Sequence, residues 1–139
     1  MKIRPFEPRD TDEVVALWDR CDLIRPWNDP RLDIARKMRV DRDLFLVGEL
    51  DDQVMVTAMV GYEGHRGWVN YLAVEPSVQR LGLGRRMMKR VEELLRERDC
   101  PKVNIQIRGT NVSAIMFYRQ LGYDVDDVVN MGKRLEKHE

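Results

Sequence analysis

The sequence predicts an α/β (α+β) fold, in which strands and helices alternate along a chain of 139 residues. Two observations lead to this prediction. Two apolar, strand-like segments joined by Asp51-Asp52 are typical of an antiparallel hairpin. Farther along, a strand, a glycine loop, a helix and another strand follow one another, and such a crossover joins parallel strands. We therefore expect a mixed sheet.

The first third of the chain is expected to form one strand and two helices. Lys2 to Phe6 suits a short strand. Asp29-Pro30 has the form of an N-cap followed by proline in the first turn of a short helix. Before it, Asp10 or Thr11 can cap a helix whose apolar face has helical spacing, formed by Val14, Leu17, Trp18 and Cys21.

The middle of the chain predicts three consecutive strands and a long helix. Leu44 to Leu50 and Gln53 to Tyr62 form the hairpin, and Trp68 to Val74 is the third strand. A helix follows from near Gly84 to about Arg98. Its apolar residues recur every three or four positions and predict a buried stripe of Leu83, Met87, Val91, Leu94 and Leu95.

The last third is expected to complete the sheet. Val103 to Arg108 predicts a strand parallel to the one before the helix, and a further helix runs from about Val112 to Leu121. Val125 to Leu135 should supply the last one or two strands. The whole prediction is a single domain, residues 1–139, with a six- or seven-stranded sheet flanked by about four helices.

Composition narrows the classes of partner. Acidic and basic residues balance at 24 each, so no net positive field favours nucleic acid or an anionic membrane. No apolar run approaches the roughly 20 residues of a membrane span, and Met1 leads directly into a strand without a signal peptide. Cys21 and Cys100 lack metal-ligand spacing. We expect a cytoplasmic protein with reduced thiols and no bound metal.

The segment Gln79-Arg80-Leu81-Gly82-Leu83-Gly84 is the most informative of the chain, because it joins an apolar strand to the start of a periodic helix. The first N–H groups of a helix have no intrahelical partner, and the positive end of the helix dipole lies behind them. Such a loop is suited to binding a phosphate or pyrophosphate group.

Two common glycine motifs do not fit this loop. A P-loop requires Lys and then Ser or Thr after its last glycine, whereas Arg85-Arg86 follow here. A dinucleotide-binding fingerprint requires a third small residue, and Met87 occupies that position. The pattern Gln79-x-x-Gly82-x-Gly84 instead matches the pyrophosphate loop of the GNAT superfamily of acetyltransferases.

A second segment strengthens this resemblance. Asn111 to Tyr123 is similar to another signature of that superfamily, in which an Asn opens a helix, a Tyr lies near its end and Leu-Gly-aromatic closes it. The resemblance extends over the whole chain and is closest to the small bacterial YpeA-type members. It implies a strongly twisted mixed sheet whose fourth and fifth strands splay apart, with the pantetheine arm of the cofactor in the gap.

The resemblance also implies an activity. We expect an acetyl-CoA-dependent N-acetyltransferase that moves an acetyl group to a primary amine by direct attack in a ternary complex. The acceptor would be a small molecule or an amine of a peptide or protein, and the enzyme a monomer or homodimer. The alternative is a non-catalytic module that binds acetyl-CoA as a sensor or partner subunit.

The predicted site residues follow from the matched motifs. Tyr118 matches the tyrosine near the cofactor sulfur and is the candidate general acid; otherwise it is a half-buried aromatic of a helix. Asn111 matches a residue near pantetheine, and a helix cap is an equal interpretation. Backbone groups should bind the rest of the cofactor: Leu72, Ala73 and Val74 along pantetheine, and Gln79, Arg80, Leu81, Gly82, Leu83, Gly84 and Arg85 around the pyrophosphate.

The base and the acceptor pocket are less defined by the sequence. Glu63 and His65 lie near the turn before the central strand, and Glu63 is the candidate general base. Trp27 and Asp29 lie between the first two helices, the region that shapes the acceptor pocket in the GNAT fold. They are candidates for acceptor binding, although Asp29 equally suits a helix cap.

Overall fold

The computed structural model describes residues 1–136. The chain divides into two units, Met1–Gln106 and Ile107–Glu139, and each is described by itself. The single domain over residues 1–139 stays a prediction. The described residues form four α-helices, as expected: α1 (Thr11–Arg20), α2 (Pro30–Lys37), α3 (Leu83–Glu97) and α4 (Val112–Gln120).

The first unit contains a five-stranded mixed sheet in the order β1-β2-β3-β4-β5. Neighbouring strands are antiparallel except β4 and β5, which are parallel, as the crossover through α3 predicts. The strands are β1 (Lys2–Pro5), β2 (Phe45–Leu50), β3 (Gln53–Tyr62), β4 (Gly67–Val74) and β5 (Val103–Ile105).

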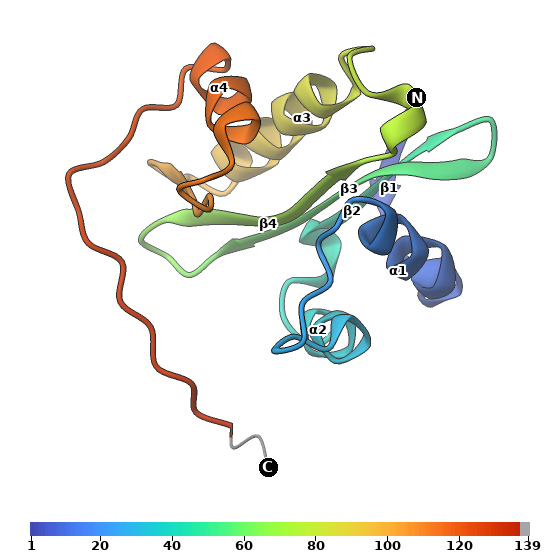
Figure 1. The fold of residues 1–139 in the computed structure, drawn as a ribbon, viewed down its shortest axis with the longest axis horizontal. Coiled ribbons are helices and arrows are strands. Elements are labelled where there is room, and N and C mark those ends of the chain that lie inside the picture. The colour runs from blue at the N-terminus through green and yellow to red at the C-terminus, as the bar shows by residue number, and fades with distance from the viewer. Residues whose placement is uncertain (137–139) are drawn as a thin grey trace. The chain divides into compact units, whose positions relative to one another are not determined.

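Helices cover both faces of this sheet (Figure 1). The helices α1 and α2 lie on one face, where α1 contributes the three fully buried side chains Val14, Leu17 and Trp18. These pack with residues of the sheet and α2 into one apolar cluster, which also contains Phe6, Ile34, Phe45, Val47, Val54 and Ala73. Two helices are thereby fixed against the centre of the sheet.

The other face of the sheet packs against α3 (Figure 1). The predicted stripe is confirmed at Leu83, Met87, Val91 and Leu95, which are buried, whereas Leu94 is half-buried. Because the stripe begins in the first turn, burial fixes the start of α3 directly after the glycine loop. Both cysteines are free thiols, and no helix among residues 1–136 is long and apolar enough to cross a membrane.

A β-bulge interrupts β4 near its centre. Thr57 of β3 pairs with Ala73, and Met59 pairs with Asn70. The two residues between Asn70 and Ala73 therefore face one residue of β3, so β4 carries one extra residue. The first of the two is Tyr71, whose φ of 53° lies in the left-handed region.

The pairing between β4 and β5 covers only part of β4. It runs from Gly67 with Val103 to Val69 with Ile105, where β5 ends. The β4 strand continues for five more residues, to Val74. The bulge and the end of β4 thus lie beyond the ladder with β5, in agreement with the expected separation of the fourth and fifth strands.

The predicted strand count of six or seven is wrong for the described residues, which form five strands. Val125 to Leu135 was expected to supply the remainder, but residues 123–136 form no strand. Asp126-Asp127 and Val128-Val129 break the alternation that a half-buried strand needs, and Asp is depleted in strands. Tyr123 accordingly does not begin a strand.

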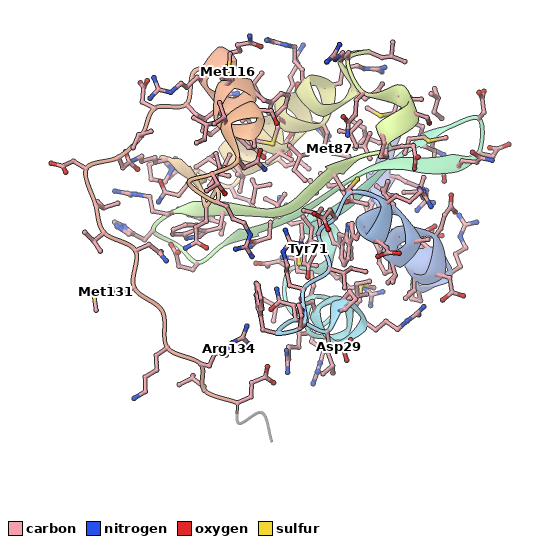
Figure 2. The ribbon with its side chains drawn as sticks, viewed as in Figure 1. Asp29, Tyr71, Met87, Met116, Met131 and Arg134 are labelled. Atoms are coloured by element: carbon pink, nitrogen blue, oxygen red, sulfur yellow. The ribbon has the colours of Figure 1, made fainter. Side chains whose placement is uncertain are left out.

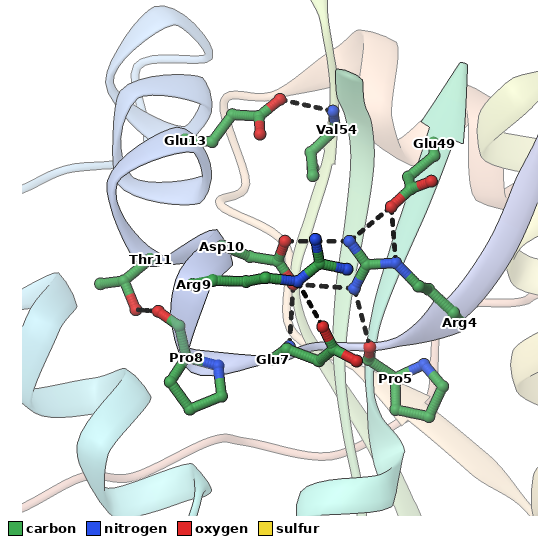
Figure 3. Close-up of polar contacts among 10 residues, drawn as sticks. All are labelled: Arg4, Pro5, Glu7, Pro8, Arg9, Asp10, Thr11, Glu13, Glu49 and Val54. Atoms are coloured by element: carbon green, nitrogen blue, oxygen red, sulfur yellow. Dashed lines mark hydrogen bonds and ion pairs between the residues drawn. The ribbon is translucent and has the colours of Figure 1, made fainter. Parts of the chain in front are cut away.

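A network of charged side chains fixes the start of the chain to the sheet (Figure 3). The guanidinium of Arg4 donates to both carboxylate oxygens of Asp10, at 2.8 and 2.9 Å, and to Glu49 of β2 at 2.6 Å. Asp10 also accepts the backbone N–H of Glu7 at 2.8 Å. Since Asp10 is 4% exposed, the network satisfies a buried carboxylate.

Candidate functional site

The start of α3 has no side-chain cap. Its N-cap residue is Gly82, at φ 78°. The helices α2 and α4 differ, because Asp29 and Asn111 accept backbone N–H groups in their first turns. The first N–H groups of α3 are thus available to an external acceptor.

The loop before α3 has the backbone shape of an anion site. Arg80, at φ 72°, and Gly82 are both left-handed, and left-handed residues are typical of turns whose N–H groups bind anions. No atom lies within 4 Å of the position that a Cβ of Gly82 would take. The side chain of Gln79 donates to the carbonyl of Val74 at 3.1 Å and ties the loop to the end of β4.

Positive charge surrounds this loop. The side chains of Arg80 and Arg85 are exposed beside it. Arg86, the next residue, donates instead to the carbonyl of Met1 at 3.3 Å, which leads its guanidinium toward the chain start. Two arginines and the dipole of a 15-residue helix therefore favour a phosphate group at the loop.

Tyr71 is held in its unusual conformation by several contacts. A left-handed conformation costs a non-glycine residue about 1–2 kcal/mol. The ring of Tyr71 stacks on Trp18, with centroids 3.8 Å apart, and its hydroxyl donates to Asp33 at 2.6 Å. Its carbonyl accepts the hydroxyl of Thr57 at 2.8 Å. The following residues Leu72, Ala73 and Val74, predicted to border the cofactor, thus extend from a rigid bulge.

The other predicted cofactor residues belong to the second unit. Asn111 caps α4, since its side-chain oxygen accepts the N–H of Ala114 at 3.1 Å. Tyr118 is buried in α4, and its ring contacts Phe117 and Tyr123 edge-on. Burial raises the pKa of Tyr118, so its hydroxyl keeps its proton at neutral pH.

Comparisons with known proteins identify the family of the chain. The model of the acetyltransferase (GNAT) family matches residues 11–123, which include the glycine loop, the bulge and α4. The chain belongs to the GNAT acetyltransferase family. It is therefore an acyltransferase.

Individual GNAT relatives cover nearly all of the chain. Acetyltransferase SG1711 of Sodalis glossinidius (strain morsitans) is 47% identical over 136 residues, which are 97% of this chain and 96% of the relative. Solved structures share the fold. The ribosomal-protein-S18-alanine N-acetyltransferase from Escherichia coli has a TM-score of 0.75 at 23% identity, over 87% of this chain and 76% of its own.

A GNAT structure with the cofactor present is also similar. The PaiA N-acetyltransferase from Thermoplasma acidophilum, solved in complex with coenzyme A, has a TM-score of 0.78 at 13% identity. The alignment covers 92% of each chain. At such identity the likeness concerns the fold, and the GNAT family itself supports acetyl-CoA as the cosubstrate.

Glu63, the candidate base, stabilises a turn in this structure. Its carboxylate accepts the backbone N–H groups of Arg66 and His65 and the indole N–H of Trp68 at 3.1 Å. These bonds, chiefly the one from Arg66, lower its pKa. A carboxylate so engaged is a weaker proton acceptor, which disfavours Glu63 as a base.

The predicted acceptor residues lie at the start of α2. The carboxylate of Asp29 accepts the N–H groups of Arg31 and Leu32, at 3.0 and 3.2 Å, so the cap interpretation is confirmed. Trp27 is 43% exposed. Both side chains are exposed, so a ligand would reach them from the solvent side. Their role in acceptor binding stays a prediction.

Sequence reasoning missed Asp33 and Tyr71. They are 38 positions apart and meet only because α2 packs beside β4, so no local spacing could have indicated the pair. The left-handed backbone of Tyr71 likewise lacks a sequence signal, since it results from contacts with α1, α2 and β3. Among residues 1–136 no group of three or more His, Cys, Asp or Glu could hold a metal ion.

Proposed function

We propose that this protein is an acetyl-CoA-dependent N-acetyltransferase whose acceptor is a primary amine of a small molecule, peptide or protein. The observation that carries the proposal is the uncapped N-terminus of α3, with two left-handed residues before it. Acetyl-CoA supplies the acetyl group as a thioester, which the amine attacks directly in a ternary complex.

The chain's own groups fit the phosphate end of this cosubstrate. The N–H groups from Arg80 to Arg85 would bind the pyrophosphate oxygens, and the open space beside Gly82 leaves room for them. Arg80 and Arg85 would add charge-assisted bonds.

Two groups would assist the reacting end. A backbone N–H of the bulge, in Leu72 to Val74, would donate to the carbonyl oxygen as negative charge develops on it. The hydroxyl of Tyr118 would give its proton to the departing sulfur as the C–S bond breaks. The new C–N bond releases one proton from the amine, which we assign to solvent water rather than to Glu63, and solvent returns a proton to Tyr118.

The small fraction of the amine that is neutral limits the rate near neutral pH. An unperturbed lysine-type amine has a pKa near ~10.4, so only about 1 in 2500 molecules is neutral at pH 7. A reaction that takes the amine already neutral should therefore accelerate about tenfold for each pH unit until the amine is deprotonated.

CoA release from acetyl-CoA, measured against a panel of amines, tests the proposal. The panel contains peptides with varied N-termini, lysine peptides, polyamines, amino acids and aminoglycosides. Acetyl-CoA binding is first measured by calorimetry in the same samples. Release that requires one class of amine establishes the activity and names the acceptor class. Absence of binding overturns the proposal, and binding without release from any amine supports a non-catalytic sensor instead.

A further inference from the structure

Three elements of the first unit converge on Tyr71 of β4. Its ring lies on the face that α1 and α2 cover, stacked on Trp18 of α1 at an interplanar angle of 11° (Figure 2). Its hydroxyl reaches Asp33 in the first turn of α2. Its carbonyl accepts Thr57 of β3. Ring, hydroxyl and backbone of one residue are thus each held by a different element.

The anchors of Tyr71 are themselves fixed. Trp18 is fully buried, and its indole N–H donates to the hydroxyl of Thr57 at 2.9 Å. Thr57 is also fully buried, and its hydroxyl donates a second hydrogen bond to the carbonyl of Tyr71. Asp33 belongs to a helix that is capped at Asp29 and anchored by the buried Ile34. The contacts therefore define one position for the bulge.

Tyr71 differs from most other residues that have a positive φ. Six other non-glycine residues have a positive φ among the described residues, and five of them are Asp, which tolerates this conformation. Tyr71 lies within a strand, directly before the residues proposed to border the cofactor. A residue stays in such a conformation only when its surroundings hold it there, and such residues concentrate at functional sites.

The hydroxyl of Tyr71 is not available for acid–base work. Burial raises its pKa, and the bond to Asp33 adds to this effect. The hydroxyl therefore remains protonated at neutral pH, with its proton directed at a carboxylate 2.6 Å away. This makes the pair a structural link between α2 and β4 rather than a source of protons.

We propose that Asp33 and the hydroxyl of Tyr71 are positioning groups for recognition of the acetyl carbonyl. Their hydrogen bond fixes the left-handed turn at Tyr71 and so sets the direction of the N–H groups that follow it in the bulge. The inference rests on the proposed function, because those N–H groups are the ones assigned to the thioester oxygen. Neither Asp33 nor the Tyr71 hydroxyl has to touch the substrate.

Two ligands that differ in this carbonyl test the proposal. Acetyl-CoA has the oxygen, and S-ethyl-CoA replaces the carbonyl by a methylene group. In the wild-type protein we expect acetyl-CoA to bind roughly threefold to tenfold more tightly, the worth of one hydrogen bond. Tyr71→Phe and Asp33→Ala should bring this ratio close to one. Asp33→Asn should keep most of it, because its amide oxygen still accepts the hydroxyl.

Matched variants separate positioning from general effects on the fold. Tyr62→Phe removes a hydroxyl of β3 that donates to the carbonyls of Gly64 and Asp99. Asp12→Ala removes a first-turn carboxylate of α1 that pairs with Arg31 at the surface. Both should retain the wild-type ratio. Because each ratio is taken within one protein, a loss of stability or of phosphate binding lowers both affinities and cancels.

The outcomes distinguish this inference from the proposed function. A wild-type ratio in Tyr71→Phe and Asp33→Ala overturns the positioning role while leaving the acetyltransferase intact. A ratio of one in the wild type overturns carbonyl recognition by the bulge. Failure of both ligands to bind the wild type overturns the proposed function itself. Should Asp33→Ala not fold, Tyr71→Phe decides alone, since it removes one oxygen atom from a half-buried side chain.

Discussion

Gly82 illustrates how a single residue can matter through the atoms it lacks. Its φ of 78° strains any other residue, and the space beside it is open to at least 4 Å. In the free protein an added methyl group would meet nothing, so its cost would be the strain alone. With a phosphate bound at the loop, the same methyl group would compete for that space.

We expect Gly82→Ala to weaken acetyl-CoA binding roughly tenfold while the protein remains folded. Calorimetric titration measures the affinity. Gly64→Ala is a matched control, since the space beside Gly64 is also open and its φ of 102° is likewise positive. An unchanged affinity in Gly82→Ala would remove the pyrophosphate from this loop.

Tyr118 is the residue at which the chemistry can be tested directly. Because its raised pKa keeps it protonated, Tyr118→Phe removes a proton donor without removing a charge. We expect kcat to fall about 100-fold with little change in acetyl-CoA affinity. Tyr123→Phe, which alters the ring next to it, should retain turnover. Equal turnover in wild type and Tyr118→Phe would exclude Tyr118 as the acid.

At the scale of elements, the hairpin and the caps of α2 and α4 were predictable because their signals are local, whereas the side-chain cap expected for α1 at Asp10 or Thr11 is absent. Asp51-Asp52 occupies a tight turn with both φ angles positive, and Asp29 caps α2 directly before Pro30. The bulge in β4 was not predictable, because the contacts that hold Tyr71 come from residues 14 to 53 positions away. The strands predicted after α4 are absent for a different reason, since Asp126-Asp127 and Val128-Val129 break the alternation that a half-buried strand needs.

The cap of α2 leads to a prediction about its stability. Asp29→Ala leaves two N–H groups without their acceptor and should lower the free energy of unfolding by about 1 kcal/mol. Asp29→Asn keeps the accepting oxygen and should retain the wild-type free energy of unfolding. Urea unfolding measures both variants. If the charge of Asp29 also attracts a cationic acceptor, Asn will retain stability yet raise the KM for that amine.

For the molecule as a whole, the network of Arg4 and Asp10 links stability to pH (Figure 3). Burial alone would raise the pKa of Asp10, but the bonds from Arg4 and the Glu7 N–H outweigh it and lower the pKa below 3.8. The unfolded chain thus takes up the Asp10 proton at a higher pH than the folded one. The stability that Asp10 contributes is fully present above its pKa in the unfolded chain and is lost as pH falls through its pKa in the folded protein.

Arg4→Met should therefore destabilise the protein most at neutral pH. It leaves a buried carboxylate without its cation, which costs about 3 kcal/mol. The deficit should shrink toward about pH 3, where Asp10 is protonated in the variant. Urea unfolding of both proteins at several pH values gives the difference. A deficit that is constant with pH would show that Arg4 acts through packing rather than through Asp10.

The uncapped start of α3 has a consequence for amide hydrogen exchange. The N–H groups of Leu83, Gly84 and Arg85 are in the first turn of a helix, where no preceding carbonyl accepts them. In the free protein they should exchange with solvent deuterium far faster than those of the following turns, although Leu83 and Gly84 are buried residues. A bound pyrophosphate would accept these same hydrogens. Deuterium uptake at these three consecutive amides would then report occupancy of the loop without any acceptor being present.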